Sequence, residues 1–184
     1  MNVRVPLGSD DKITQRIYQS LGSALKHTAH MKSLSKAIKG NDLLKCALLI
    51  ENVHPGDLNR VYDSMNHSTP LIYCCSLPRK EVVKMLIDKG ADVNCVDGDG
   101  TSPLAVSIFL DEDLAEMLMW NGADPCGPYN AMYSILHILV YYGKTKLVKT
   151  ALDSPFVIDR MLQHQLLQIA HDKGHSDIVN LLTK

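Results

Sequence analysis

The sequence of 184 residues predicts an all-α fold, a solenoid of about five helix–turn–helix units preceded by one amphipathic helix. Three observations lead to this prediction. Short phrases recur every 32 to 33 residues, apolar pairs at helical spacing lie between them, and only 5% of the residues are aromatic. Such a period is typical of stacked helical pairs, because a single small pair cannot bury its own apolar face.

The N-terminal segment, residues 1–30, lies outside the repeated pattern. Ile13, Ile17, Leu21 and Leu25 recur at every fourth position within it, which predicts one apolar stripe on a helix. We expect this amphipathic helix to cover the end of the stack.

Two phrases define the repeats. Residues 90–94 read Gly-Ala-Asp-Val-Asn and recur as Gly-Ala-Asp-Pro at 122–125, while Thr-Pro-Leu at 69–71 recurs as Ser-Pro-Leu at 102–104. A hydroxyl residue before proline favours the start of a helix. A glycine after an apolar stripe, as at 90 and 122, favours its end.

Between these signals, apolar residues fall at i, i+3 and i+4, as in Leu114, Met117 and Leu118. The predicted repeats span about 31–66, 67–98, 99–130, 131–160 and 161–184. The third is one residue short between its helices, so we expect a tight connection there. The Asp-Gly-Asp-Gly run at 97–100 predicts a turn between repeats.

This combination of motifs resembles the ankyrin repeat, strongly in the second and third units and weakly in the others. The resemblance implies a stack of helical pairs that binds other proteins and does not act as an enzyme. It also implies that the turn tips and first helices carry the binding face. On this chain, those positions and their neighbours are Leu77, Asp99, Thr101, Phe109, Tyr129, Tyr133, Tyr141 and Tyr142.

The aromatic residues support the same face. Four of the seven tyrosines lie in the fourth predicted repeat or in the turn that leads into it, at Tyr129, Tyr133, Tyr141 and Tyr142. Tyrosine is common in binding hot spots, because it offers a large contact area at low entropic cost. The alternative is that these rings pack between repeats. Trp120 is expected either to fill space against the fourth repeat or to form a second contact.

Other residues give further predictions about structure and chemistry. The resemblance implies a structural role for His137 and a site of oxygen-dependent hydroxylation at Asn94. The chain contains no catalytic motif and no metal-ligand spacing, so we expect no cofactor and no bound metal. Basic residues of the second repeat and acidic residues of the third form either a solvated face or a guide to partner orientation.

Composition limits the function further. The formal charge is −1, which does not favour nucleic-acid binding through a basic surface. No run approaches the ~18 apolar residues of a membrane span, and no signal peptide is evident. Five cysteines without a CxxC pair are typical of buried thiols in a reducing compartment, so we expect a cytoplasmic or nuclear protein.

The preferred function is a regulatory subunit, adaptor or inhibitor of a cell-cycle or signalling complex, with a protein kinase as the favoured partner. Small ankyrin proteins of this kind include inhibitors of cyclin-dependent kinases. Two alternatives remain. One is a viral-type mimic of the inhibitor of NF-κB that occludes a transcription factor, and the other is a scaffold that tethers membrane or cytoskeletal proteins.

Overall fold

The computed structural model describes residues 12–130 and 132–183, and for residues 12–25 it describes the backbone helix without the side chains. This part of the chain contains ten α-helices and two short 3-10 helices. They are α1 (Lys12–Lys39), α2 (Leu43–Glu51), η1 (Pro55–Asp57), η2 (Asp63–Met65), α3 (Pro70–Cys75), α4 (Lys80–Asp88), α5 (Pro103–Leu110), α6 (Glu112–Trp120), α7 (Ile135–Tyr141), α8 (Thr145–Leu152), α9 (Arg160–Asp172) and α10 (Ser176–Leu182).

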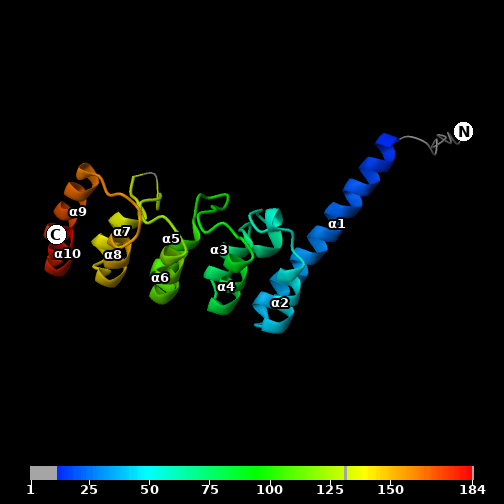
Figure 1. Ribbon diagram of the computed structural model, residues 1–184, viewed down its shortest axis with the longest axis horizontal. Coiled ribbons are helices and arrows are strands. Elements are labelled where there is room, and N and C mark those ends of the chain that lie inside the picture. The colour runs from blue at the N-terminus through cyan, green and yellow to red at the C-terminus, as the bar shows by residue number, and fades with distance from the viewer. Residues whose placement is uncertain (1–11, 131, 184) are drawn as a thin grey trace, which may run out of the picture.

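The helices form pairs that stand side by side, from α1 and α2 at one end to α9 and α10 at the other (Figure 1). The connecting turns project from one side of the stack (Figure 1). In the described residues the only β structure is two isolated bridges, one of which joins Tyr62 to Ser68. The predicted all-α repeat solenoid is therefore confirmed.

The first helix of most repeats begins at a side-chain cap. Thr69 and Ser102 lie in extended backbone, and their hydroxyls accept hydrogen bonds from the backbone N–H groups of Ile72 and Ala105. The following proline occupies the first turn, where its missing N–H costs nothing. The Thr-Pro and Ser-Pro signals in the sequence thus mark the start of these helices.

The short third repeat has the tight connection that its sequence predicts. Asp111 ends α5 and also caps α6, so one residue joins the two helices. Its carboxylate accepts hydrogen bonds from the backbone N–H groups of Asp113 and Leu114, both at 3.1 Å. An extended backbone at Asp111 makes the reversal possible.

The core between the helices is aliphatic. Leucine, isoleucine, valine, alanine, methionine and cysteine supply nearly all of its buried side chains, and Tyr73 is its one buried aromatic residue in the described chain. Small side chains let neighbouring repeats approach closely, which explains the low aromatic content. The five cysteines are free thiols, four of them buried. Burial raises the pKa of Cys75 to about 12, so this thiol stays neutral.

Asparagine side chains connect the turns of successive repeats. The Oδ1 atom of Asn59 accepts a hydrogen bond from the backbone N–H of Asp92 at 2.9 Å. One repeat later, Asn94 accepts from the N–H of Asp124 at 2.8 Å and donates to the carbonyl of Gly122 at 2.9 Å. These bonds fix the spacing of the first three turns.

Helix α1 crosses the expected boundary at residue 30 without a break, so the first repeat begins inside a longer helix. Its C-terminal part packs on α2 and η2, while its N-terminal part extends beyond the stack (Figure 1). The side chains of Ile13, Ile17, Leu21 and Leu25 lie outside the described ones, as do residues 1–11 entirely. No described helix is long and apolar enough to cross a lipid bilayer.

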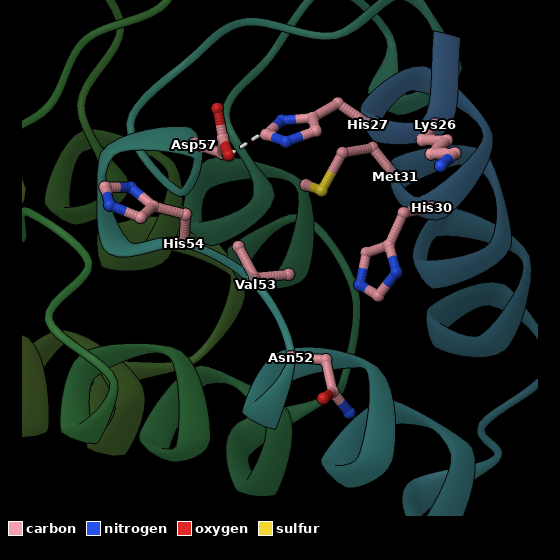
Figure 2. Close-up of a pocket in the computed structure, with 8 residues that line it drawn as sticks. All are labelled: Lys26, His27, His30, Met31, Asn52, Val53, His54 and Asp57. Carbon is pink, nitrogen blue, oxygen red and sulfur yellow. Dashed lines mark ion pairs between the residues drawn. The ribbon is translucent and has the colours of Figure 1, made fainter. Parts of the chain in front are cut away.

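Apolar residues of α1, among them Leu34 and Ile38, pack in the core, and two histidines add polar contacts to the first repeat (Figure 2). His27 Nδ1 lies 2.8 Å from the carboxylate of Asp57, whose nearly buried side chain belongs to η1. His30 Nε2 lies 2.9 Å from the carbonyl of Leu49. His27, His30 and Asp57 help to line a small pocket of about 160 Å³ between α1 and the segment that follows α2. The apolar stripe expected to cover the end of the stack lies outside the described side chains, so that role stays a prediction.

Candidate partner-binding groove

Aromatic rings from two repeats meet at one surface. Phe109, at the end of α5, contacts Tyr142 edge to face with ring centroids 5.1 Å apart, and contacts Tyr129 at 6.4 Å. Tyr142 also contacts Tyr141 edge to face at 5.1 Å. All four rings remain more than a third exposed, so they are only partly used by the fold. This arrangement leaves a continuous aromatic surface open to a partner.

A groove of about 450 Å³ continues this surface toward the last repeat. One wall comes from α7 and its preceding turn and the other from α9. The lining residues are Asn130, Tyr133, His137, Ile138, Tyr141, Tyr142, Ile169, Asp172 and Lys173. The ammonium of Lys173 lies 3.9 Å from the centre of the Tyr141 ring, a cation–π contact that holds both side chains in place.

Structural contacts beneath the groove fix its shape. His137 is the third residue of α7, and its side chain accepts from the backbone N–H of Ser134 in a reciprocal capping box. His175 Nε2 lies 3.2 Å from the carbonyl of Tyr141, which links the fifth repeat to the end of α7. Both histidines therefore act in the fold, as the sequence suggested for His137.

The structure brings together five of the eight residues expected at the binding face, namely Phe109, Tyr129, Tyr133, Tyr141 and Tyr142. The other three lie elsewhere. Leu77 is half-buried against the core, and Asp99 and Thr101 belong to the preceding turn. In that turn, the backbone N–H groups of Asp99 and Thr101 both donate to the carboxylate of Asp97.

Sequence reasoning missed Ile138 and Ile169, which supply apolar lining for the groove. Both lie on stripes that resemble ordinary core positions, so no local signal separates them from buried residues. Trp120 does not fill space between repeats, because 63% of it is exposed. It ends α6 and is not among the residues that line the groove.

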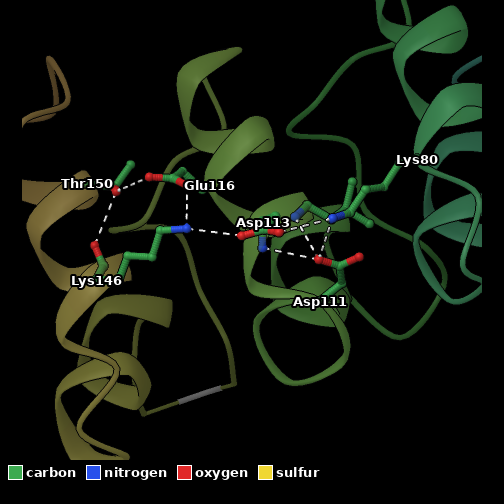
Figure 3. A network of polar contacts seen from close by, with 7 residues as sticks. Lys80, Asp111, Asp113, Glu116, Lys146 and Thr150 are labelled. Carbon is green, nitrogen blue, oxygen red and sulfur yellow. Dashed lines mark hydrogen bonds and ion pairs between the residues drawn. The ribbon is translucent and has the colours of Figure 1, made fainter.

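The acidic residues of the third repeat are paired within the chain (Figure 3). Lys80 of the second repeat lies 2.9 Å from Asp111 and 3.5 Å from Asp113. Lys146 of the fourth repeat lies 3.0 Å from Asp113 and 2.8 Å from Glu116. The charged side chains thus form a ladder across three repeats, a pairing that neither interpretation of the sequence included.

This ladder shifts the protonation of its members. Hydrogen bonds from Lys146 lower the pKa values of Asp113 and Glu116 below their ordinary values. The same bonds raise the pKa of Lys146 well above its ordinary value. The groups are exposed, so each pair contributes little to stability by itself. Their common effect is to orient the third repeat between its neighbours.

Asn94 has a structural role in the turn, because both atoms of its amide form hydrogen bonds to the third repeat. These bonds account for an asparagine at this position, and hydroxylation there stays a prediction. Among the described residues, no cluster of three or more histidine, cysteine or acidic side chains is placed to hold a metal ion.

Comparison with known families agrees with this architecture. A family model described as ankyrin repeats, in three copies, matches residues 34–127, just over half of the chain. The chain therefore belongs to the ankyrin-repeat family. It is a protein–protein interaction module, and proteins of this family are typically not enzymes.

Proposed function

We propose that this protein is a regulatory subunit, adaptor or inhibitor that captures a protein partner through the aromatic groove between its third and fifth repeats. The observation that carries the proposal is the set of partly exposed rings around the 450 Å³ groove. Tyrosine and phenylalanine in such a position bury a large apolar area when a partner binds, and tyrosine hydroxyls can still hydrogen bond.

The groove suits a segment of a partner protein more than a small molecule. It lies between helices of two repeats of an interaction module, and Tyr133, Tyr141 and Tyr142 along it stay more than a third exposed. Its lining is mixed, with Lys173 and Asp172 at one side and aromatic rings at the other. We infer that the partner presents an apolar side chain to the rings and polar groups to the rim.

The favoured partner is a protein kinase of a cell-cycle or signalling complex in the cytoplasm or nucleus. This choice follows from the resemblance to small ankyrin regulators of kinases. Affinity purification from the native cells followed by mass spectrometry tests it. Recovery of a kinase supports regulation of a kinase, recovery of a transcription factor supports occlusion, and recovery of channels or cytoskeletal proteins supports tethering.

The binding face is tested with the recovered partner. Replacing Tyr141 and Tyr142 with alanine should weaken binding by about 2 kcal/mol or more, because both rings belong to the aromatic surface. The thermal unfolding transition should change little, because the two side chains are 45% and 57% exposed. Trp120→Ala is the matched control, since this equally exposed ring lies outside the groove.

Two results would contradict this assignment. A large loss of stability in the double variant would mean that the rings act mainly as core. Equal losses of affinity in the double variant and in Trp120→Ala would mean that the partner covers a different surface.

A further inference from the structure

The opposite end of the stack has an apolar edge. Leu44 and Leu48 lie on α2 and are 82% and 69% exposed. They are four residues apart and therefore share one face of the helix. Cys46 and Ile50, which are buried, lie on the other face of α2. The two leucines thus point away from the core of the first repeat.

Equivalent positions in the next two repeats are occupied differently. The comparison counts back from the C-cap residue of the second helix in each repeat. Four residues before the C-cap, the second and third repeats have Met85 and Met117, both partly buried against the core. Eight residues before the C-cap, these two repeats have the exposed acidic residues Glu81 and Asp113. The first repeat has Leu48 and Leu44 at these positions. It therefore exposes two leucines where each neighbouring repeat has one partly buried methionine and one exposed acidic residue.

The same region is strongly basic. Residues 12–51 contain seven lysines and arginines but only two acidic residues, although the whole chain has a charge of −1. Helix α1 contains no acidic residue. Lys32, Lys36, Lys39 and Lys45 are all exposed on the first helix pair. A partner for this edge needs an apolar stripe and negative charge.

We propose that this edge binds an acidic amphipathic helix of a partner protein. Each inner edge in the stack packs against a neighbouring helix pair, so the geometry of the first pair suits a helix. Negative charge on that helix complements the exposed lysines and favours its capture over other apolar helices. The site is separate from the aromatic groove and does not depend on the function proposed for it.

A second copy of the chain fits less well. Joining two basic edges would bring like charges together, which is unfavourable. Joining the basic edge to the other end of a second copy would place the leucines against α10, whose exposed residues include Ser176, Asp177 and Asn180. An anionic membrane also fits less well, since a helix that binds a bilayer needs a broader apolar face than two leucines.

The test uses the full-length protein and a synthetic helical peptide with leucines at every third or fourth position and glutamates elsewhere. Binding is followed by fluorescence anisotropy of the labelled peptide. A peptide with the same leucines and lysines in place of the glutamates is the charge control. We expect the acidic peptide to bind, the lysine peptide to bind at least about tenfold more weakly, and salt to weaken the acidic complex.

The variant Leu44→Ser/Leu48→Ser should bind the acidic peptide at least about tenfold more weakly. Its fold should persist, because both side chains are exposed. Val157→Ser/Met161→Ser removes two equally exposed apolar side chains near the other end of the stack and should bind normally. The Tyr141→Ala/Tyr142→Ala variant should also bind the peptide normally, which separates this site from the groove.

Four outcomes would overturn the proposal. One is absence of binding at millimolar acidic peptide, and another is equal binding of the acidic and lysine peptides. A third is dimerisation of the unmodified protein in ultracentrifugation that the Leu44→Ser/Leu48→Ser variant abolishes, which would assign the edge to a second copy. The fourth is leucine-dependent binding to phosphatidylserine vesicles without peptide binding, which would assign it to a membrane.

Discussion

Replacing Gly143 with alanine should destabilise the protein more than replacing Gly174, although both glycines adopt a similar positive φ. The angles are +66° and +72°. A residue with a Cβ atom in this region costs about 1–2 kcal/mol, and this cost applies to both positions. The two sites differ in their surroundings. A Cβ at Gly143 would lie 2.8 Å from Cε1 of His175, whereas nothing lies within 4 Å of one at Gly174.

The additional cost at Gly143 is that of overpacking. Forcing a methyl group against a fixed neighbour costs about 1–3 kcal/mol, so Gly143→Ala should lose about 2–5 kcal/mol in total. Gly174→Ala should lose only about 1–2 kcal/mol. Turning the His175 ring aside would break the hydrogen bond between its Nε2 and the carbonyl of Tyr141.

Urea unfolding, followed by the circular dichroism signal of the helices, measures the loss of unfolding free energy in both variants. The variant His175→Ala completes a double-mutant cycle, because Gly143→Ala should cost little beyond its backbone strain once the ring is absent. Equal losses at Gly143 and Gly174, or no coupling between Gly143 and His175, would refute the reasoning. Once the partner is identified, Gly143→Ala should also weaken binding to that partner, since Tyr141 and Tyr142 directly precede this turn.

Two further predictions follow from the described side chains. The Tyr73 hydroxyl is buried without a hydrogen-bond partner among them, so Tyr73→Phe should raise the unfolding free energy by about 1 kcal/mol, and a lower value in urea unfolding would contradict this. Asp113 and Glu116 have lowered pKa values, so their contribution is present above their ordinary values of 3.8 and 4.5 and is lost as pH falls through the folded values. The urea midpoint should therefore fall less steeply with acid in Lys146→Met than in the unmodified protein, and parallel curves would argue against the ladder.

The repeat fold could be predicted because its signals are local. A hydroxyl before proline at Thr69 and Ser102 caps a helix by contacts within four residues, and a glycine at 122 ends one in the same way. The missing residue at Asp111 likewise has a local consequence. Each signal acts through the backbone of its own repeat, so tertiary structure cannot easily override it.

The extent of α1 could not be predicted from the repeat motif. The motif begins near residue 31, but a helix continues until a helix-breaking residue or a cap ends it. No glycine or proline lies between residues 23 and 39, and Gly40 directly follows the last helical residue. The helix therefore continues through the boundary that the repeat pattern suggests.

The candidate site could be predicted in part for a similar reason. The tyrosines are unusual at their positions, so their clustering was visible along the chain. Contacts between repeats were not visible. No local sequence motif indicates that the ammonium of Lys146 contacts Asp113 and Glu116, which precede it by 33 and 30 residues. The position of α9 against the tyrosines likewise depends on the rotation between the fourth and fifth repeats.

The asparagine bonds between turns have a consequence for how the stack comes apart. At the next junction the position equivalent to Asn94 is Cys126, whose backbone N–H also donates to an aspartate two residues earlier. A thiol is only a weak donor and a weak acceptor, so it does not reproduce the two amide hydrogen bonds of Asn94. Beside the apolar core and the Phe109–Tyr142 ring contact, lysine–carboxylate pairs link the third and fourth repeats, and dissolved ions screen these pairs. Added salt therefore weakens polar contacts at a junction where a cysteine stands in place of the asparagine, and the aromatic surface lies directly across this junction.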